Sequence, residues 1–287
     1  MRRRFEGKVA IVTGSGRGIG RATVLGLARE GARCCVTART VEDIEAVASQ
    51  VRASGGEAIA VKADVGDTAQ VVNMIEKTVE AFGRLDVLVN NAAGGPASTP
   101  GHSATILECT EEEWDATINA TLTSVFRVSH YSLPHIIKSG GGSIINVSST
   151  RGLTGRKARV GYGAAKAGVI NLTRCMALDL VPYNVRVNCV CPGHVESEYM
   201  KATADIIRDP LKRGEILSSL TPAGCETVEK RLEFYEGHPE QLASVLGTGF
   251  IGYPDELANA IIFLASEDAS FVNGDILVVD GGSSAGK

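Results

Sequence analysis

The sequence alternates short apolar runs with longer amphipathic segments, and this alternation restricts the possible folds more than any other feature. The apolar runs are rich in β-branched residues and cover residues 9–12, 34–36, 58–61, 87–89, 144–147, 185–190 and 276–279. Near-continuous apolar runs of this length are typical of strands buried on both faces of a parallel sheet. The segments between them repeat apolar residues at helical spacing, as in 21–30, 41–53 and 69–82. We therefore expect an α/β fold of Rossmann type, with a doubly wound, seven-stranded, mainly parallel sheet flanked by helices.

The chain reads as a single domain over residues 1–287, because neither an internal repeat nor a linker interrupts it. One region departs from the alternation: from about residue 198 to 252 there is no strand-like run. This region is interpreted either as a lid over the functional site or as a surface insertion. It follows the sixth predicted strand, at the carboxyl edge where such sheets bind ligands, and this position favours the lid.

Composition excludes several classes of function. The formal net charge is -4, which gives no indication of nucleic-acid binding. No stretch approaches the roughly 18 uncharged residues of a membrane span, and the basic start of the chain is not followed by an apolar run typical of a signal peptide. The seven cysteines include no CxxC pair and no cluster with metal-ligand spacing. We expect reduced thiols, no metal site and a cytoplasmic location.

A glycine-rich turn follows the first predicted strand directly. Residues 13–20 read TGSGRGIG, and a predicted helix comes next. Glycines let the backbone turn sharply and let a pyrophosphate approach the helix N-terminus, whose free N–H groups favour negative charge. The alternative is an ordinary glycine-rich turn, but its position between a strand and a helix predicts a dinucleotide site.

The end of the second predicted strand indicates which dinucleotide binds. That strand ends in Thr37-Ala38-Arg39-Thr40, without the carboxylate that usually accepts hydrogen bonds from the ribose of NAD. A guanidinium binds a 2′-phosphate through charge-assisted hydrogen bonds, and we expect both Arg39 and Arg17 to reach that position. The alternative is that both arginines are solvated surface residues. The pattern favours NADP (NADPH) as the cofactor.

Tyr162 and Lys166 are four residues apart on a predicted helix and therefore share one face. A neighbouring cation stabilises a phenolate and so favours proton transfer near neutral pH. A serine hydroxyl across the pocket would bind the substrate oxygen. The Y-x-x-x-K spacing alone is common, and it gains meaning from the nucleotide turn in the same chain.

Together these motifs resemble the short-chain dehydrogenase/reductase family over about residues 5–282. They occur in the order of that family and comprise residues 13–20, Asp64-Val65, residues 90–93, Asn119, Ser149, Tyr162 with Lys166, and Pro192-Gly193. The resemblance implies an enzyme that exchanges a hydride between a nicotinamide cofactor and a carbonyl or alcohol.

The resemblance also implies roles for individual residues. Ser149 would hold the substrate oxygen, and it fits the S-x-x-G pattern better than its neighbour Ser148. Tyr162 would donate or accept the proton, Lys166 would bind the nicotinamide ribose and stabilise the phenolate, and Asn119 would anchor a water that links Lys166 to solvent. The implied cofactor-binding residues are Gly14, Ser15, Arg17, Gly18, Ile19, Gly20, Arg39, Thr40, Asp64, Val65, Asn91, Ala92, Tyr162, Lys166, Pro192, Gly193, Val195 and Ser197.

Two positions depart from the commonest pattern of the family. Ala93 stands where glycine is frequent, but Gly94 follows it. Ser197 replaces the usual threonine near the pyrophosphate and keeps the hydroxyl group. Neither change affects the expected chemistry.

The substrate is less clearly indicated, and a small or medium-sized ketone or secondary alcohol is expected. Residues 94–105, residues 150–161 and the lid should line its pocket. The second of these segments contains four basic residues, Arg151, Arg156, Lys157 and Arg159. They are interpreted either as a site for an anionic substrate or, as charge runs usually are, as a solvated loop, and the second interpretation is favoured. The histidines His102 and His194 are interpreted as bystanders at the pocket mouth.

Other functions stay open as alternatives. A 3-oxoacyl-(acyl carrier protein) reductase would need arginines where Gly140 and Tyr183 stand, which weakens that alternative. A non-catalytic NADP-binding regulator would not need Ser149, Tyr162 and Lys166 together. Enoyl reduction is usually associated with a wider spacing of tyrosine and lysine. The resemblance further implies a homotetramer or homodimer that pairs through the helices bearing Asn119 and Tyr162 and through residues 275–280.

Overall fold

The structure is a computed structural model and describes residues 3–94, 104–195 and 252–285. Seven strands form one sheet in the order β3-β2-β1-β4-β5-β6-β7, and every neighbouring pair is parallel. Their bounds are β1 Val9–Thr13, β2 Arg33–Ala38, β3 Ala58–Lys62, β4 Val87–Asn90, β5 Gly142–Val147, β6 Val185–Pro192 and β7 Ile276–Val279. The expected Rossmann-type, seven-stranded sheet is confirmed.

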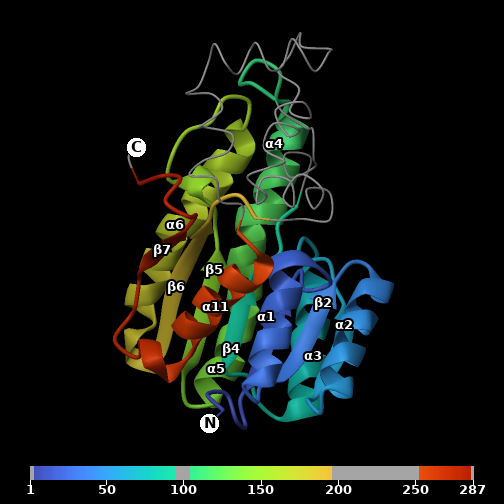
Figure 1. The fold of residues 1–287 in the computed structure, drawn as a ribbon. Coiled ribbons are helices and arrows are strands. Elements are labelled where there is room, and N and C mark those ends of the chain that lie inside the picture. The colour runs from blue at the N-terminus through green and yellow to red at the C-terminus, as the bar shows by residue number, and fades with distance from the viewer. Residues whose placement is uncertain (1–2, 95–103, 196–251, 286–287) are drawn as a thin grey trace, which may run out of the picture.

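Helices cover both faces of the sheet (Figure 1). The longer ones are α1 Gly18–Arg29, α2 Val41–Ala53, α3 Thr68–Phe82, α4 Glu111–Ile118, α5 Ser124–Lys138, α6 Val160–Asp179 and α11 Pro254–Ala265. Short 3-10 turns occur at Thr150–Gly152, Val181–Tyr183 and Glu267–Ala269. One π-helical turn, Asn119–Thr123, joins α4 to α5.

The core is split between the two faces by the alternation of side chains along each strand. Ala10 and Val12 of β1 pack in one cluster with α1, α2 and α11. Val9 and Ile11 of the same strand pack in the other cluster with α3, α5 and α6. All five residues of β1 are buried, as expected for a strand covered on both faces.

The cysteines of β2 and β6 belong to this core. Cys34, Cys35, Cys189 and Cys191 are fully buried, and burial raises the pKa of the Cys34 and Cys35 thiols to about 12. The six cysteines in the described part of the chain are free. These thiols act as small apolar side chains.

The carboxyl ends of all seven strands point to the same edge of the sheet. In Figure 1 this is the upper edge, beyond which α4 and the beginning of α6 extend. The chain's N-terminal part lies at the opposite edge, where Arg4 donates to Glu30 (3.0 Å) and Asp268 (3.3 Å). The proposed lid at about 198–252 lies outside the described residues except for Gly252, whose N–H donates to the His194 carbonyl (2.9 Å). None of the helices in the described ranges combines the length and apolar character needed to cross a bilayer.

Candidate active site

A cleft of about 770 Å³ runs along the carboxyl edge of the strands. This volume is within the usual range for small-molecule and cofactor sites, about 300–1,000 Å³. The predicted site residues that line it are Gly14, Arg17, Ile19, Arg39, Thr40, Asp64, Val65, Asn91, Ala92, Ser149, Tyr162 and Gly193. The glycine-rich turn and the predicted proton donor, far apart in sequence, therefore face one space.

The turn after β1 has the geometry that a pyrophosphate requires. Helix α1 begins at Gly18, and Arg17 provides no side-chain cap, so the first N–H groups of the helix are available for an anion. Gly18 has φ +54, and a Cβ built on it would meet no atom within 4 Å. The space in front of the turn is open, and the turn's residues fit the phosphates of a dinucleotide.

Gly20 and Ser15 stabilise the conformation of the turn itself. A Cβ on Gly20 would lie 2.4 Å from the Gly14 carbonyl oxygen, so only glycine fits there. The buried Ser15 hydroxyl accepts the N–H of Thr37 (2.9 Å) and so ties the turn to β2. Neither residue is among those that line the cleft. They shape the site from behind.

Asn91 and Thr13 hold the glycine turn against the loop after β4. The Asn91 amide donates to the carbonyls of Thr13 (2.9 Å) and Gly14 (3.1 Å). In return, the buried Thr13 hydroxyl accepts the N–H groups of Asn91 and Ala92, both at 3.0 Å. Sequence reasoning identified Asn91 and missed the role of Thr13.

The cofactor end of the cleft carries charges of both signs. Arg17 and Arg39 are exposed and line it, as the NADP interpretation requires. Asp43, in the first turn of α2, also lines it, and a Cβ on Gly16 would lie 2.7 Å from the Asp43 Cβ. Sequence reasoning missed this carboxylate because it follows the end of β2 by several residues.

Ser149 and Ser148 have different environments. The Ser148 hydroxyl is buried and donates to the Lys166 carbonyl (2.8 Å). Ser149 lines the cleft, and its oxygen accepts the N–H of Arg151 (3.2 Å). Because that bond uses a lone pair, the Ser149 hydroxyl proton is still available to a ligand.

Lys166 is buried beneath Tyr162 on the same face of α6. Its Nζ lies 5.7 Å from the centre of the Tyr162 ring and donates to the Val147 carbonyl (2.8 Å). Among the described residues the Lys166 ammonium donates to this carbonyl alone, although an ammonium carries three N–H donors. The end of β5 thus holds a positive charge under the tyrosine.

Asn119 occupies the first position of the π-helical turn, a feature that often marks functional sites. Its Oδ1 accepts a hydrogen bond from Arg127 (3.1 Å), which also donates to the Val65 carbonyl (2.8 Å) and the Thr68 hydroxyl (3.0 Å). Arg127 therefore connects α5 to the loop expected to contact adenine. Neither the π turn nor this role of Arg127 is visible in the sequence, and the water relay from Asn119 to Lys166 stays a prediction.

The loop at the other end of the cleft differs from the favoured sequence interpretation. Arg151, Arg156 and Arg159 line the cleft together with Tyr162 and His194. The interpretation of a solvated loop holds in part: Arg156 and Lys157 are exposed, and Lys157 lies outside the lining, whereas Arg151 and Arg159 are partly buried. His194 is also part of the lining, with its Nε2 3.4 Å from the Arg151 guanidinium.

The remaining predicted residues either lie behind the residues that line the cleft or fall outside the described part of the chain. Pro192 is the last residue of β6, and Val195 forms an isolated bridge with Gly252. Ser197 and His102 lie outside the described residues. Gly193 is packed on Asp280, since a Cβ there would lie 2.6 Å from the Asp280 Cβ. Among the described residues no group of three or more His, Cys, Asp or Glu side chains could hold a metal ion.

Comparison with known proteins identifies relatives over nearly the whole chain. A family model described as short chain dehydrogenase matches residues 8–206, and one described as Enoyl-(Acyl carrier protein) reductase matches residues 232–284. The 3-oxoacyl-[acyl-carrier-protein] reductase FabG of Thermotoga maritima is 35% identical and aligns over 97% of this chain and 98% of its own. Cyclohexanol dehydrogenase of an Acinetobacter species is 34% identical, over 98% of this chain and 96% of its own. The (2S)-[(R)-hydroxy(phenyl)methyl]succinyl-CoA dehydrogenase subunit BbsD of Thauera aromatica is 33% identical, over 98% of both chains.

Proposed function

Because the chain belongs to the short-chain dehydrogenase family, we propose that it transfers a hydride between NADP(H) and a ketone or secondary alcohol of a small or medium-sized molecule. As a member of this family it is an oxidoreductase that acts on CH–OH or C=O groups and uses a nicotinamide cofactor. The choice of NADP, the residue roles and the substrate are the proposal. The observation that carries it is the presence of the glycine-rich turn, Ser149 and Tyr162 in one cleft.

The proposed cofactor residues follow the cleft from one end to the middle. Residues 14–19 would bind the pyrophosphate, Arg17 and Arg39 the 2′-phosphate, and Asp64 with Val65 the adenine. Two guanidinium groups support NADP over NAD, since each offers charge-assisted hydrogen bonds to a phosphate. When bound, the nicotinamide supplies or accepts the hydride.

The proton chemistry is assigned to the protein's own side chains. The Ser149 hydroxyl donates to the substrate oxygen while its own oxygen is held by the Arg151 N–H (3.2 Å). Tyr162 gives its phenolic proton to that oxygen during reduction and takes it back during oxidation. Lys166, fixed by the Val147 carbonyl, provides the positive charge that favours the phenolate.

A Tyr162→Phe variant tests this assignment and separates it from a non-catalytic regulator. We expect kcat to fall about 10²- to 10⁴-fold, because one acid/base group contributes about that much. Binding of NADPH, measured by fluorescence titration, should stay unchanged. Tyr183→Phe, an exposed tyrosine outside the cleft, is the matched control. Full activity in Tyr162→Phe would exclude the mechanism.

Reduction of a 3-oxoacyl group on acyl carrier protein is a second candidate, favoured by the names of relatives at 34–35% identity. It predicts higher kcat/KM for a carrier-bound 3-oxoacyl group than for the same group on a small thiol. Gly140 and Tyr183, which carry no charge, argue against this candidate because the acidic carrier would meet no arginine there.

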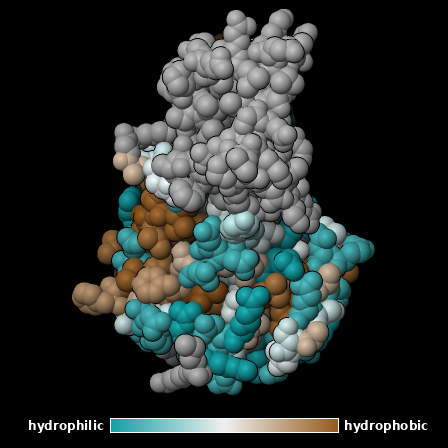
Figure 2. All heavy atoms as spheres, viewed as in Figure 1, coloured by the Kyte–Doolittle hydropathy of each residue, from teal (hydrophilic) through white to brown (hydrophobic). Residues whose placement is uncertain are grey.

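A homotetramer or homodimer and a cytoplasmic location complete the proposal. Large apolar side chains are exposed near β7, including Phe271 (103%), Leu178 (77%) and Val278 (38%). Figure 2 shows apolar surface gathered over β6 and β7 on the visible face. Association of two copies through this face would cover it, and analytical ultracentrifugation measures the resulting mass.

A further inference from the structure

Three arginines of one short loop share the cleft with the proposed proton donor. Arg151 is part of the 3-10 turn that follows Ser149, and Arg159 directly precedes α6, which carries Tyr162. Arg156 lies between them, and all three line the cleft. Arginine stays protonated in proteins, so this end of the cleft carries a concentrated positive charge.

Arg151 is held inside the cleft. Its residue is partly buried, and its Nη2 lies 3.4 Å from the Nε2 of His194. Burial, followed by the charge of Arg156, lowers the pKa of the Arg151 guanidinium, while Tyr162 acts in the opposite direction. Arg156 and Tyr162 are therefore close enough to Arg151 to influence its protonation equilibrium.

Within the described residues, Arg151 and Arg156 form no ion pair with a carboxylate. The two carboxylates in the described lining, Asp43 and Asp64, belong to the cofactor end. Arg151 is partly buried and Arg156 is exposed. For a partly buried cation that has no counter-ion among the described residues, an anionic ligand would offset the cost of desolvation.

The backbone of the loop is fixed in an unusual conformation. Ala158 has φ +58, a left-handed conformation that costs a non-glycine residue about 1 kcal/mol or more. Its carbonyl accepts the N–H of Ala104 (3.2 Å), and Ala104 forms a bridge with Arg159. This contact fixes the backbone between Arg156 and Arg159, both of which line the cleft.

We propose that the substrate carries a carboxylate on the same molecule as its reacting carbonyl or alcohol, and that Arg151 and Arg156 bind this carboxylate. The inference rests on the proposed function. In reduction the carbonyl carbon gains the hydride of NADPH, the carbonyl oxygen gains the proton of Tyr162, and NADP⁺ is left. The carboxylate is unchanged, and it orients the carbonyl toward Ser149 and Tyr162. A guanidinium can bind a carboxylate with two parallel hydrogen bonds, which adds orientation to affinity.

The test compares oxo acids with their methyl esters, which share the ketone and differ in charge. The series runs from 3-oxobutanoate to 6-oxoheptanoate, with NADPH saturating. We expect kcat/KM for the best acid to exceed that of its ester at least tenfold. The neutral N-acetylcysteamine thioester of 3-oxobutanoate represents the acyl-carrier substrate and should be poorer than the best acid.

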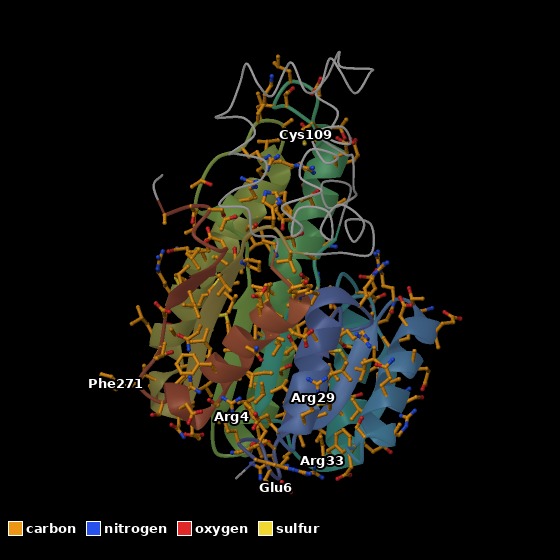
Figure 3. All side chains as sticks on the ribbon, in the orientation of Figure 1. Arg4, Glu6, Arg29, Arg33, Cys109 and Phe271 are labelled. Carbon is orange, nitrogen blue, oxygen red and sulfur yellow. The ribbon has the colours of Figure 1, made fainter. Side chains whose placement is uncertain are left out.

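Three variants assign the preference to the arginines. Arg151→Gln and Arg156→Gln should each lower the acid-to-ester ratio of kcat/KM at least tenfold. Arg151→Lys should lower this ratio less, because lysine keeps the positive charge but cannot form two parallel hydrogen bonds to a carboxylate. Arg29→Gln removes the same charge at the opposite end of the molecule, where Figure 3 labels Arg29, and should leave the ratio unchanged. Equal rates for acids and esters in the wild type, or a preference that survives the double variant R151Q/R156Q, would overturn the inference.

Calorimetric titration of the enzyme–NADP⁺ complex with the same acids and esters separates this inference from the proposed function. Arginine-dependent binding of the acids without reduction of any ketone would support the anion site and contradict the proposed chemistry. Reduction of neutral ketones without binding of any acid would support the chemistry and overturn the anion site.

Discussion

The two ends of the cleft are built in different ways. At the cofactor end, backbone conformation determines the shape of the site. Gly14 and Gly18 have positive φ, and the buried hydroxyls of Thr13 and Ser15 stabilise the turn through hydrogen bonds. At the substrate end, long side chains on a loop determine the environment. The turn at the cofactor end restricts the sequence because positive φ favours glycine. In the proposed function, by contrast, substrate specificity depends on loop side chains that can be exchanged without changing the fold.

Lys166 lies beneath Tyr162, and its replacement should have the largest effect. In Lys166→Met the charge under Tyr162 is lost, and kcat should fall about 10²- to 10⁴-fold. The variant also leaves the Val147 carbonyl unpartnered, at a cost of about 1–3 kcal/mol in the free energy of unfolding. Steady-state kinetics and urea unfolding measure the two effects, with Lys77→Met on the exposed side of α3 as the control. A decrease in kcat of less than tenfold would show that the lysine has only a structural role.

Arg39 tests whether charge also decides selectivity at the cofactor end. Arg39→Gln should weaken NADPH binding about tenfold to hundredfold, since a hydrogen bond to a charged group is worth about 1.5–3 kcal/mol. NADH lacks the 2′-phosphate, and its dissociation constant should stay within a factor of three. Asp43→Asn, which removes the nearby carboxylate, should strengthen NADPH binding. Equal losses for both cofactors in Arg39→Gln would contradict the NADP assignment.

Asp280 lies behind Gly193, and its titration should have a smaller effect. Burial alone would raise the pKa of this carboxyl, but hydrogen bonds from Ser284, Ser283 and the backbone hold it below its usual range. Its stabilising contribution is therefore complete above the unfolded-state pKa, about 4, and is lost as the pH falls through the lower folded-state value. Asp280→Asn should lower the free energy of unfolding by about 1 kcal/mol at pH 7. The difference in the free energy of unfolding between variant and wild type should become smaller below pH 4. A difference that stays constant with pH would contradict this explanation.

Ala158 should give the smallest effect. Ala158→Gly relieves the left-handed strain but makes the unfolded chain more flexible, so a gain of less than about 1 kcal/mol in the free energy of unfolding is expected. Thermal unfolding measures it, with Ala164→Gly in α6 as the control, where glycine should destabilise by about 1 kcal/mol. A loss of stability in Ala158→Gly would show that the loop does not store strain.

The sequence predicted most of the fold and the cofactor end of the site. Strand run 276–279 and helix 41–53 match the observed elements, because a short continuous apolar run and a helical repeat of apolar residues are both visible in the sequence. The glycine turn was identifiable for a similar reason, since positive φ demands glycine. The partners of Arg127 and the conformation of Ala158 depend on tertiary contacts, which local spacing does not contain. The burial of Arg151 was missed because a charge run looks the same in sequence whether it faces solvent or a cleft.

The parallel arrangement of the strands has a practical consequence for handling the enzyme. All the loops of the cleft leave the sheet at one edge, while the N-terminal part of the chain is attached at the other by Arg4, Glu30 and Asp268 (Figure 1, Figure 3). A purification tag or a surface linker at the N-terminus would therefore leave the cleft facing the solution. Immobilisation through the first residues should preserve access for both cofactor and substrate.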